Sequence, residues 1–324
     1  MRAIQVSAHG GPEVLSPVEL PDPEPRPGEV LVAARAAGVN FIDTYRRAGL
    51  YPSTPPYVPG DEGSGEIVAV GDGVQNLAVG DRVAWCDAGG SYAELVRVRA
   101  DRALPIPDDV DYAVAGSALL RGLTAHYLLH DSAKPTAGDT ILVHAGAGGV
   151  GLILTEWATA RGIRVITTVS SDAKEALSRA AGAAEVLRYT DDVPARVREA
   201  TGGAGVPVVY DGVGATTFEQ SLASTAVRGT IVLFGAASGP VPPFDLQRLN
   251  AAGSLSVTRP SLAHFIADPS EFAWRAEEFF GAVRDGTLTV EVGQSFPFTA
   301  AEAAHRALES RGTVGTTVLD VVPD

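Results

Sequence analysis

A glycine-rich segment near the middle of the chain has the spacing of a nucleotide-binding turn. It reads Gly146-Ala147-Gly148-Gly149-Val150-Gly151 and fits the pattern G-x-G-x-x-G. In such a turn the first glycine permits a tight bend, the second lets a pyrophosphate approach the backbone, and the third lets helix and strand pack closely. The N–H groups and positive end of the following helix then hold the phosphates. The spacing predicts dinucleotide contacts from Gly146, Gly148, Gly149, Val150 and Gly151.

The residues on either side supply the strands and the helix that this turn requires. The apolar run Ile141–Val143 predicts a buried strand, and Val165–Val169 predicts a second one. Between them, apolar residues recur at the spacing of one helical face: Val150, Leu154, Trp157 and Ala158. A chain with 36 glycines produces some G-x-G-x-x-G patterns by chance. The strand–turn–helix context therefore favours a dinucleotide site over a purely structural glycine turn.

Polar residues at the end of the second strand bear on the choice of coenzyme. NAD enzymes usually place an acidic residue there, which binds the ribose 2′-OH. This chain has Ser170 and Ser171, then Asp172 and Lys174. Two hydroxyls and a lysine at a helix start suit a 2′-phosphate, so we expect NADPH. Asp172 could instead repel that phosphate or bind the ribose of NADH, but a capping-box start with Glu175 is the favoured interpretation.

Length and composition indicate a soluble two-domain protein. A chain of 324 residues suggests about two domains, each large enough to bury a core. A net charge of −14 argues against binding to nucleic acid or to anionic membranes. No apolar run reaches the roughly 18 residues of a membrane span, and the N-terminal residues lack the apolar core of a signal peptide. We expect a cytoplasmic protein.

Cys86 is the one cysteine in the sequence. A single cysteine excludes an intramolecular disulfide and a multi-cysteine zinc site. We expect Cys86 to be a small buried side chain rather than a nucleophile.

The first hundred residues predict mainly β structure. Short β-prone runs are separated by turn residues, which indicates a compact barrel-like domain: Arg2–Ser7, Glu29–Ala36, Gly65–Val70, Arg82–Trp85 and Tyr92–Val98. From Asp111 to His130 the pattern becomes helical and apolar and leads to the glycine turn.

Helices and strands then alternate. Helices are predicted at Ala173–Ala181 and Val193–Ala200, and strands at Val186–Tyr189, Val206–Tyr210 and Thr230–Phe234. This alternation predicts an open parallel sheet that binds its ligand at the carboxyl ends of the strands. After Pro260 the pattern changes to a long helix (Glu271–Val283), a helix opened by a Thr299–Glu302 capping box, and a last strand (Thr316–Val321). We expect this tail to pack on the N-terminal domain.

Several motifs together resemble the medium-chain dehydrogenase/reductase superfamily, and within it the zinc-free quinone oxidoreductases related to zeta-crystallin. The motifs keep their order along nearly the whole chain: Asn40-Phe41-Ile42-Asp43-Thr44-Tyr45, Arg47-Ala48-Gly49-Leu50-Tyr51-Pro52, Gly63-Ser64-Gly65, Arg121-Gly122-Leu123-Thr124, Ala147-Gly148-Gly149-Val150-Gly151, Tyr210-Asp211-Gly212-Val213-Gly214 and Val257-Thr258-Arg259-Pro260-Ser261-Leu262. The resemblance implies an α/β protein with a GroES-like β-barrel catalytic domain (residues 1–120, with 261–324 packing back on it) and a Rossmann doubly wound parallel-sheet domain (residues 121–260) that binds NADPH. It also implies a homodimer.

The resemblance bears on zinc as well. Zinc-dependent relatives place a cysteine at the position of Asn40 and a histidine at that of Asp61. Asn40 is a poor zinc ligand, so we expect no metal. Asp61 and Glu62 could in principle bind one, but adjacent carboxylates without histidine are more often a solvated or hydrogen-bonded pair.

The resemblance also implies further cofactor contacts. Lys174 and Tyr189 match positions that hold NADPH. Weaker matches to cofactor-lining positions are Thr124, Tyr127, Gly212, Gly235, Ser238, Arg259 and Arg311. Arg311 could equally be an exposed arginine at a helix end.

Asn40, Tyr45 and Tyr51 are the candidate catalytic residues. Amide and phenol groups can hydrogen-bond a substrate oxygen that gains negative charge as hydride arrives. Asp43 is expected to orient a loop or a tyrosine hydroxyl. The first hypothesis is an NADPH-dependent quinone reductase with a small-molecule substrate. The alternatives are a reductase of α,β-unsaturated ketones or aldehydes, and a nucleotide-binding structural or RNA-binding protein.

Overall fold

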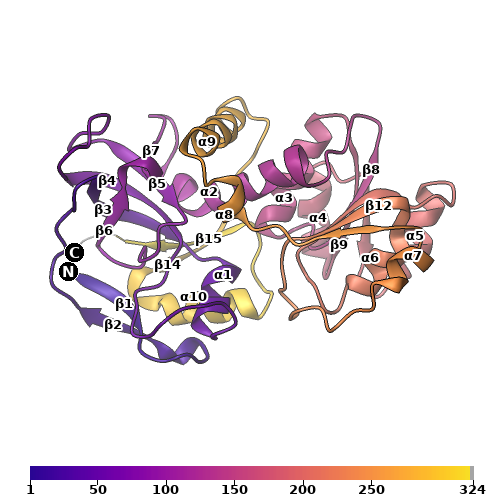
Figure 1. Ribbon diagram of the computed structural model, residues 1–324, viewed down its shortest axis with the longest axis horizontal. Coiled ribbons are helices and arrows are strands. Elements are labelled where there is room, and N and C mark those ends of the chain that lie inside the picture. The colour runs from indigo at the N-terminus through magenta and orange to yellow at the C-terminus, as the bar shows by residue number, and fades with distance from the viewer. Residues whose placement is uncertain (322–324) are drawn as a thin grey trace. The chain divides into compact units, whose positions relative to one another are not determined.

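A computed structural model describes residues 1–321 and divides into two compact units (Figure 1). Unit 1 comprises Met1–Arg121, Asp268–Arg284 and the described part of Val290–Asp324. Unit 2 comprises Gly122–Ala267 and Asp285–Thr289. The chain after Pro260 is therefore shared, because residues 261–267 and 285–289 cluster with unit 2 and the rest cluster with unit 1.

Unit 1 is built on a seven-stranded sheet with the order β14-β15-β3-β4-β5-β7, in which β6 also pairs with β3. Its long central strand, β3, pairs antiparallel with β4, β6 and β15. β1 and β2 form a separate antiparallel pair. The strands of unit 1 are β1 (Arg2–Val6), β2 (Leu15–Glu19), β3 (Glu29–Gly38), β4 (Glu62–Val70), β5 (Arg82–Cys86), β6 (Leu95–Arg99), β7 (Leu104–Pro105), β14 (Val292–Pro297) and β15 (Thr316–Asp320).

Helices α1 (Phe41–Arg47), α9 (Pro269–Arg284) and α10 (Ala301–Glu309) belong to unit 1, with short 3-10 turns at Pro12–Val14, Ala100–Arg102 and Phe298–Ala300. Apolar side chains from the sheet and from α10 share one core, with Trp85 and Tyr92 among its largest members. Cys86 is buried, as expected.

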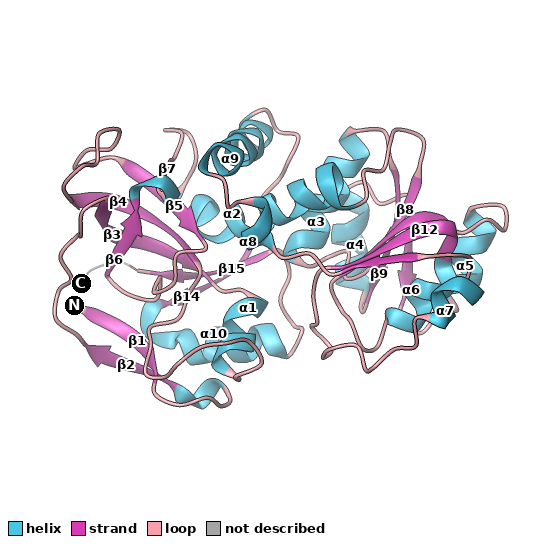
Figure 2. Cartoon of the chain, in the orientation of Figure 1, coloured by secondary structure: helices cyan, strands magenta, loops and turns pink. Residues whose placement is uncertain are grey.

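Unit 2 contains a six-stranded sheet, and every strand pair in it is parallel. The order is β10-β9-β8-β11-β12-β13, from β8 (Thr140–Val143), β9 (Arg164–Val169), β10 (Glu185–Arg188), β11 (Val206–Asp211), β12 (Thr225–Leu233) and β13 (Ser256–Thr258). Figure 2 shows helices flanking these strands: α3 (Gly149–Ala160), α4 (Asp172–Ala180), α5 (Val193–Ala200), α6 (Phe218–Ser224) and α7 (Gln247–Ala251). A further short helix, α8 (Leu262–Phe265), follows β13 in the chain. The prediction of an open parallel sheet is confirmed.

The unit boundary falls within one continuous helix. α2 (Tyr112–Tyr127) runs across the division between Arg121 and Gly122 and continues as a π-helical segment, Leu128–Ser132. The helical pattern predicted for residues 111–130 is therefore confirmed.

Two local predictions were wrong. Thr299 does not cap the last helix, because Phe298–Ala300 forms a 3-10 turn and Ala300 is the N-cap of α10. The mainly β interpretation of the first hundred residues missed α1. Seven residues give too few turns for a periodic pattern, and the helix depends on a capping box between Asn40 and Asp43.

Membrane-crossing helices can be assessed over residues 1–321. None of the helices in this range is both long enough and apolar enough to span a bilayer.

Candidate functional site

The glycine turn connects β8 to α3 through a tight bend at Ala145. Ala145 has a φ of 58°, and its carbonyl accepts a hydrogen bond of 2.9 Å from the N–H of Gly148. Gly148 is the N-cap of α3, and the helix begins at Gly149. The left-handed residue of the bend is therefore Ala145, the residue before the first glycine of the motif.

Two glycines of the motif, Gly146 and Gly151, are required by close packing. A Cβ on Gly146 would lie 2.4 Å from the Cβ of Thr167 on β9, and a Cβ on Gly151 would lie 2.2 Å from the carbonyl oxygen of Ala145. Real Cβ atoms do not approach that closely. The third glycine thus has its predicted packing role, and the first glycine has a packing role too.

The start of α3 fits a pyrophosphate. The first N–H groups of a helix, here those of Gly149, Val150 and Gly151, have no carbonyl one turn earlier to bond. Gly148 presents no side chain in front of them, and a Cβ there would meet only Ala145 within 4 Å. Free N–H groups and the positive helix end form an anion site that a phosphate can approach closely.

The residues after β9 hold the start of α4. Ser171 is the N-cap, and its hydroxyl accepts a hydrogen bond of 3.4 Å from the N–H of Lys174. Asp172 is not the cap. Its exposed carboxylate pairs with Arg188 at 2.6 Å, and Glu175 pairs with the same guanidinium nitrogen at 2.6 Å. Sequence analysis did not connect Arg188 with the start of α4, because Arg188 lies on a different element, β10.

Tyr189 lies beside the glycine turn. Its hydroxyl accepts a hydrogen bond of 3.0 Å from the N–H of Ala145. Its ring also stacks on buried His144, with centroids 6.5 Å apart. His144 Nδ1 lies 2.9 Å from the Thr168 hydroxyl, and burial lowers the pKa of this histidine. The structure thus brings Tyr189 to the bend that precedes α3.

Two more turns follow the carboxyl ends of β11 and β12. The buried carboxylate of Asp211 accepts hydrogen bonds from the N–H groups of Val213 and Gly214 and from the Thr217 hydroxyl. Gly212 and Gly235 lie in direct backbone contact, since a Cβ on Gly235 would be 2.4 Å from the Gly212 carbonyl oxygen.

Ser238 connects these two turns. Its hydroxyl donates to the carbonyl of Val213 at 2.8 Å and accepts from the N–H of Thr216 at 3.0 Å. The structure therefore brings Gly212, Gly235 and Ser238 together at one edge of the parallel sheet.

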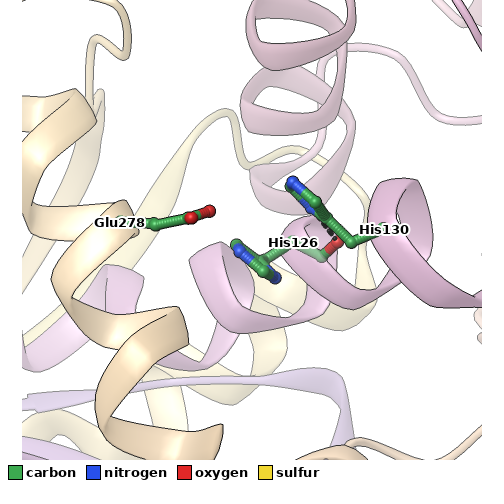
Figure 3. Close-up of side chains that lie close together, drawn as sticks. All are labelled: His126, His130 and Glu278. Carbon is green, nitrogen blue, oxygen red and sulfur yellow. Dashed lines mark hydrogen bonds between the residues drawn. The ribbon is translucent and has the colours of Figure 1, made fainter.

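Thr124 and Tyr127 are buried on α2, and the Tyr127 ring stacks on Phe265 of α8 at 4.4 Å. His126 of α2 and His130 of the π-helical segment that follows it stack with ring centroids 3.9 Å apart (Figure 3). His130 Nδ1 lies 2.9 Å from the His126 carbonyl oxygen. Sequence analysis did not single out this histidine pair.

The two predicted arginines are exposed. Arg259 lies just after β13 in unit 2, and its Nη1 is 3.4 Å from the Pro260 carbonyl oxygen. Arg311 belongs to unit 1, where it follows α10 with a φ of 59°.

The candidate catalytic residues lie in unit 1 on and after α1. Tyr45 and Tyr51 are adjacent, with ring centroids 5.3 Å apart. Asn40 is buried at the start of the helix, and its Nδ2 donates to Glu62 Oε1 at 2.8 Å. One N–H of the Asn40 amide is thus already engaged within the protein.

Asp61 and Glu62 are both buried and hydrogen-bonded, which is the second of the two arrangements expected for this pair. Asp61 forms an ion pair with Arg46. Glu62 accepts from Asn40 and from the N–H of Leu120 at 2.7 Å, and Arg121 lies 3.7 Å away. Burial raises the pKa of both carboxyl groups, and their cationic neighbours oppose this shift.

A pocket of about 310 Å³ opens beside these residues in unit 1. Its wall includes Asp43, Arg46, Tyr57 and Asp61. α1 supplies Asp43 and Arg46, which are three positions apart and so share one face of the helix. Sequence analysis missed this pocket, because its walls come from segments that are separate in the chain.

A buried chain of polar groups leads to Asp43. Arg47 Nη1 lies 2.8 Å from His305 Nδ1, His305 Nε2 lies 3.1 Å from the Tyr92 hydroxyl, and that hydroxyl lies 3.4 Å from Asp43 Oδ2. Burial lowers the pKa of His305 to about 3, and Arg47 adds to the shift. The expectation that Asp43 contacts a tyrosine hydroxyl is confirmed.

Comparisons with known proteins match both units. The family model described as an alcohol dehydrogenase GroES-like domain matches residues 26–108, and the one described as a zinc-binding dehydrogenase matches residues 149–278. A quinone oxidoreductase of Pseudomonas aeruginosa is 45% identical, over 98% of this chain and 99% of the relative.

Two solved structures that contain NADPH are also similar. A mycobacterial protein complexed with NADPH has a TM-score of 0.96 and 57% identity, over 98% of this chain and 99% of its own. The quinone oxidoreductase of Escherichia coli complexed with NADPH has a TM-score of 0.97 and 41% identity, over 99% of this chain and 100% of its own.

Proposed function

Because this chain belongs to the quinone oxidoreductase family of the medium-chain dehydrogenase/reductase superfamily, we propose that it reduces quinones with NADPH and without zinc. The observation that carries the cofactor assignment is the glycine turn. It exposes the N-terminus of α3, and Gly148, the N-cap, has no side chain that would block a phosphate there. NADPH supplies a hydride to the acceptor when it is bound.

Different residues of unit 2 bind different parts of the cofactor. The N–H groups of Gly149, Val150 and Gly151 hold the pyrophosphate. Lys174, with Ser170 and the Tyr189 hydroxyl, holds the 2′-phosphate. Ser171 contributes mainly as the helix cap, because its hydroxyl accepts from the Lys174 N–H. The remaining contacts come from Gly146, Thr124, Tyr127, Gly212, Gly235, Ser238, Arg259 and Arg311.

The residues of unit 1 act on the acceptor. Tyr45 and Tyr51 lie side by side, so their two phenols can present hydroxyls to one ligand. Asn40 has one amide N–H engaged with Glu62 and a second N–H for an acceptor oxygen. These groups stabilise the negative charge that develops on the quinone oxygen.

Zinc independence is supported by what Asn40 and Asp61 already contact. Asn40 donates to Glu62, and Asp61 is neutralised by Arg46. A zinc ion would have to displace both interactions and would gain no histidine or thiolate ligand from these positions. Metal analysis of the purified protein should find less than stoichiometric zinc, and a strong chelator should leave quinone turnover unchanged. Activity that chelation removes and zinc restores would overturn the proposal.

Steady-state assays test the function itself. We expect NADPH oxidation to accelerate with quinones, and to be slower with NADH in place of NADPH. Turnover of an α,β-unsaturated ketone well above that of any quinone would favour the enone reductase alternative. Binding of labelled RNA that NADPH displaces, without turnover of either acceptor class, would favour the nucleotide-binding alternative.

A homodimer in the cytoplasm is also proposed. β13 is the last strand in the order of the unit 2 sheet, so it offers a backbone edge to a second copy. Sedimentation equilibrium would test the dimer, and cell fractionation the location.

A further inference from the structure

Glu62 is a fully buried carboxylate that contacts the candidate catalytic residue Asn40. It lies at the start of β4, and its two oxygens have different partners. Oε1 accepts a hydrogen bond of 2.8 Å from Asn40 Nδ2, and Oε2 accepts one of 2.7 Å from the backbone N–H of Leu120 on α2. One carboxylate therefore connects the residue that begins α1 to a neighbouring helix.

Other groups hold the backbone around Asn40. The N–H of Asn40 donates to Asp43 Oδ2 at 2.8 Å. Arg121 Nη2 donates to the carbonyl oxygen of the preceding residue, Val39, at 2.7 Å. These bonds fix the main chain at residue 40 whichever way its side-chain amide is turned. The bond to Glu62 is different, because it acts on the amide itself.

The amide of Asn40 has two orientations, which exchange its oxygen and its NH₂ group. A carboxylate can only accept hydrogen bonds, so Glu62 selects the orientation in which the NH₂ group faces Oε1. One N–H is then bound to Glu62, and the second N–H of the same nitrogen can donate to an acceptor oxygen. In the flipped orientation an oxygen would take the place of the NH₂ group and would repel an acceptor oxygen that gains negative charge.

The charge of Glu62 is compensated within the same cluster. An isolated carboxylate next to Asn40 would disfavour an oxyanion bound by that residue. The guanidinium of Arg121 is also buried and lies 3.7 Å from Glu62 Oε1, so the pair has no net charge. Burial raises the pKa of Glu62, although Arg121 and the two hydrogen bonds oppose the shift. Glu62 can therefore orient the amide without leaving an uncompensated charge beside it.

The packing around Glu62 leaves space for this carboxylate. A Cβ on Gly38, the last residue of β3, would collide with Glu62 Oε1, which is the oxygen that Asn40 binds. Gly38 does not have a left-handed φ, so the backbone conformation does not require a glycine at this position. Its missing side chain instead provides the room in which Glu62 reaches Asn40.

We propose that Glu62 is a positioning residue, which binds the Asn40 amide so that an N–H rather than the amide oxygen faces the acceptor during hydride transfer. The inference rests on the proposed reductase function and on the role proposed there for Asn40. Glu62 acts through Asn40 and does not itself contact the acceptor.

Turnover should fall as the pH falls through the pKa of Glu62. The carboxylate accepts a hydrogen bond at each oxygen, so a proton on either one breaks the bond to Asn40 or the bond to Leu120. The oriented amide is therefore present above this pKa and lost below it. The charged and titratable groups that interact with Glu62 are Arg121, Asp61, Asp43, Cys86 and Tyr92.

The variant Glu62→Gln tests the proposal with a side chain of nearly the same shape. The new amide has one oxygen for two donors. When this oxygen accepts from the Leu120 N–H, the new NH₂ group faces Asn40, whose amide must flip to accept from it. We expect a turnover number with a benzoquinone at least about ten-fold lower, because one donor to the developing oxyanion is lost. The dissociation constant of NADPH should be unchanged, and the decline in acid should disappear.

Ser64→Ala is the matched control. Ser64 is also buried on β4, and its hydroxyl donates to the Tyr112 carbonyl oxygen on α2 at 2.6 Å. The control therefore weakens the same contact between strand and helix without changing a partner of Asn40. It should lower the melting temperature and leave the turnover number and its pH profile unchanged.

A double-mutant cycle separates positioning from a purely structural role. Asn40→Ala removes the amide that Glu62 orients, so Glu62→Gln should then lower turnover less than about two-fold. An equal loss in the native and Asn40→Ala backgrounds would show that Glu62 acts independently of Asn40, and the proposal would be wrong. A folded Glu62→Gln with native turnover and pH profile would also overturn it.

A second measurement needs neither turnover nor NADPH. The sequence has three asparagines, Asn40, Asn76 and Asn250, and the last two are exposed. Isotope labelling of asparagine therefore gives NMR spectra in which the Asn40 side-chain amide can be assigned by its loss in Asn40→Ala. In the native protein one of its two protons should be shifted downfield and should exchange slowly with water, and Glu62→Gln should abolish both properties.

A native protein in which neither amide proton of Asn40 has these properties would overturn the proposal, even if Glu62→Gln failed to fold. If the native protein reduced no quinone or enone, the proposed function itself would fail. The spectrum would still report whether Glu62 holds the Asn40 amide, so the two failures are distinguishable.

Discussion

Arg188 holds Asp172 in an ion pair of 2.6 Å across the start of α4. The same guanidinium nitrogen also contacts Glu175 at 2.6 Å, so one cation serves both carboxylates. This pairing neutralises the acidic residue that lies nearest in sequence to Ser171, the cap of α4. It gives a physical reason why an aspartate at this position is compatible with a 2′-phosphate.

Replacement of Lys174 by alanine should remove most of the preference for NADPH. We expect NADPH to bind at least ten-fold more weakly, a change of about 1.4 kcal/mol, because Lys174 supplies the charge opposite the 2′-phosphate. Affinity for NADH should be nearly unchanged. Titrations of both coenzymes test this, with Arg179→Ala on the same helix as a control. An unchanged ratio of the two affinities would remove Lys174 from the site.

Replacement of Arg188 by glutamine should weaken NADPH binding by a smaller factor. The carboxylate of Asp172 would then be unneutralised next to the bound phosphate. Exposed ion pairs are worth about 0.2–1 kcal/mol, which corresponds to no more than about a five-fold change. The double variant Asp172→Asn, Arg188→Gln should recover the native dissociation constant. If the single and double variants bind equally, the ion pair does not influence the phosphate site.

Tyr45→Phe should lower quinone turnover without changing NADPH affinity. The substitution keeps the ring beside Tyr51 and deletes one donor to the developing oxyanion. Loss of such a donor costs on the order of 100-fold in rate, and a reactive quinone should show a smaller loss. Tyr112→Phe, whose ring packs under Arg82, serves as the control. A loss below about three-fold would contradict the role, and a lowered melting temperature with full activity would make Tyr45 a packing residue.

The substitution His305→Gln should make the free energy of unfolding fall less steeply as the pH decreases. Native His305 stays neutral until its pKa of about 3, whereas in the unfolded chain its pKa is about 6.5. Between these values the unfolded state binds one more proton, so the free energy of unfolding falls as the pH falls. The slope is about 1.4 kcal/mol per pH unit, and stability is fully present above about pH 6.5.

Glutamine can accept from Arg47 and donate to Tyr92 but does not titrate in this range. Chemical denaturation of both proteins at pH 4, 5, 6 and 7 would measure the slope. The buried carboxyl groups are common to both proteins and cancel in the difference. Identical slopes would show that His305 does not control acid stability.

The parallel sheet could be predicted from the sequence because its determinants are local. The run Ile141–Val143, the glycine turn and the spacing of Val150, Leu154 and Trp157 all fall within about twenty residues. Each strand and helix of this kind carries its own periodic pattern. The general location of the ligand also follows from where parallel strands end, whereas the choice of Gly235 and Ser238 came from the family resemblance.

The polar core of unit 1 could not be predicted in the same way. Arg46 meets Asp61 from another segment, and Arg47 meets His305 across 258 positions of sequence. No local spacing encodes such pairs, since they exist only after the sheet has brought their elements together. The wall of the unit 1 pocket includes the pair of Arg46 and Asp61, so this pocket became visible only with the structure.

The contact between Arg47 and His305 also affects which of the two units finishes folding first during synthesis of the chain. Unit 2 is nearly continuous in sequence, so most of it leaves the ribosome before α10 and β15 are made. Unit 1 cannot close until then, because β3 lacks its β15 neighbour and the buried guanidinium of Arg47 lacks His305 and Glu309. Domains generally fold as units as they emerge from the ribosome. In this protein the N-terminal unit is therefore expected to be completed last, and a nascent chain released before α10 should hold a folded unit 2 beside an open unit 1.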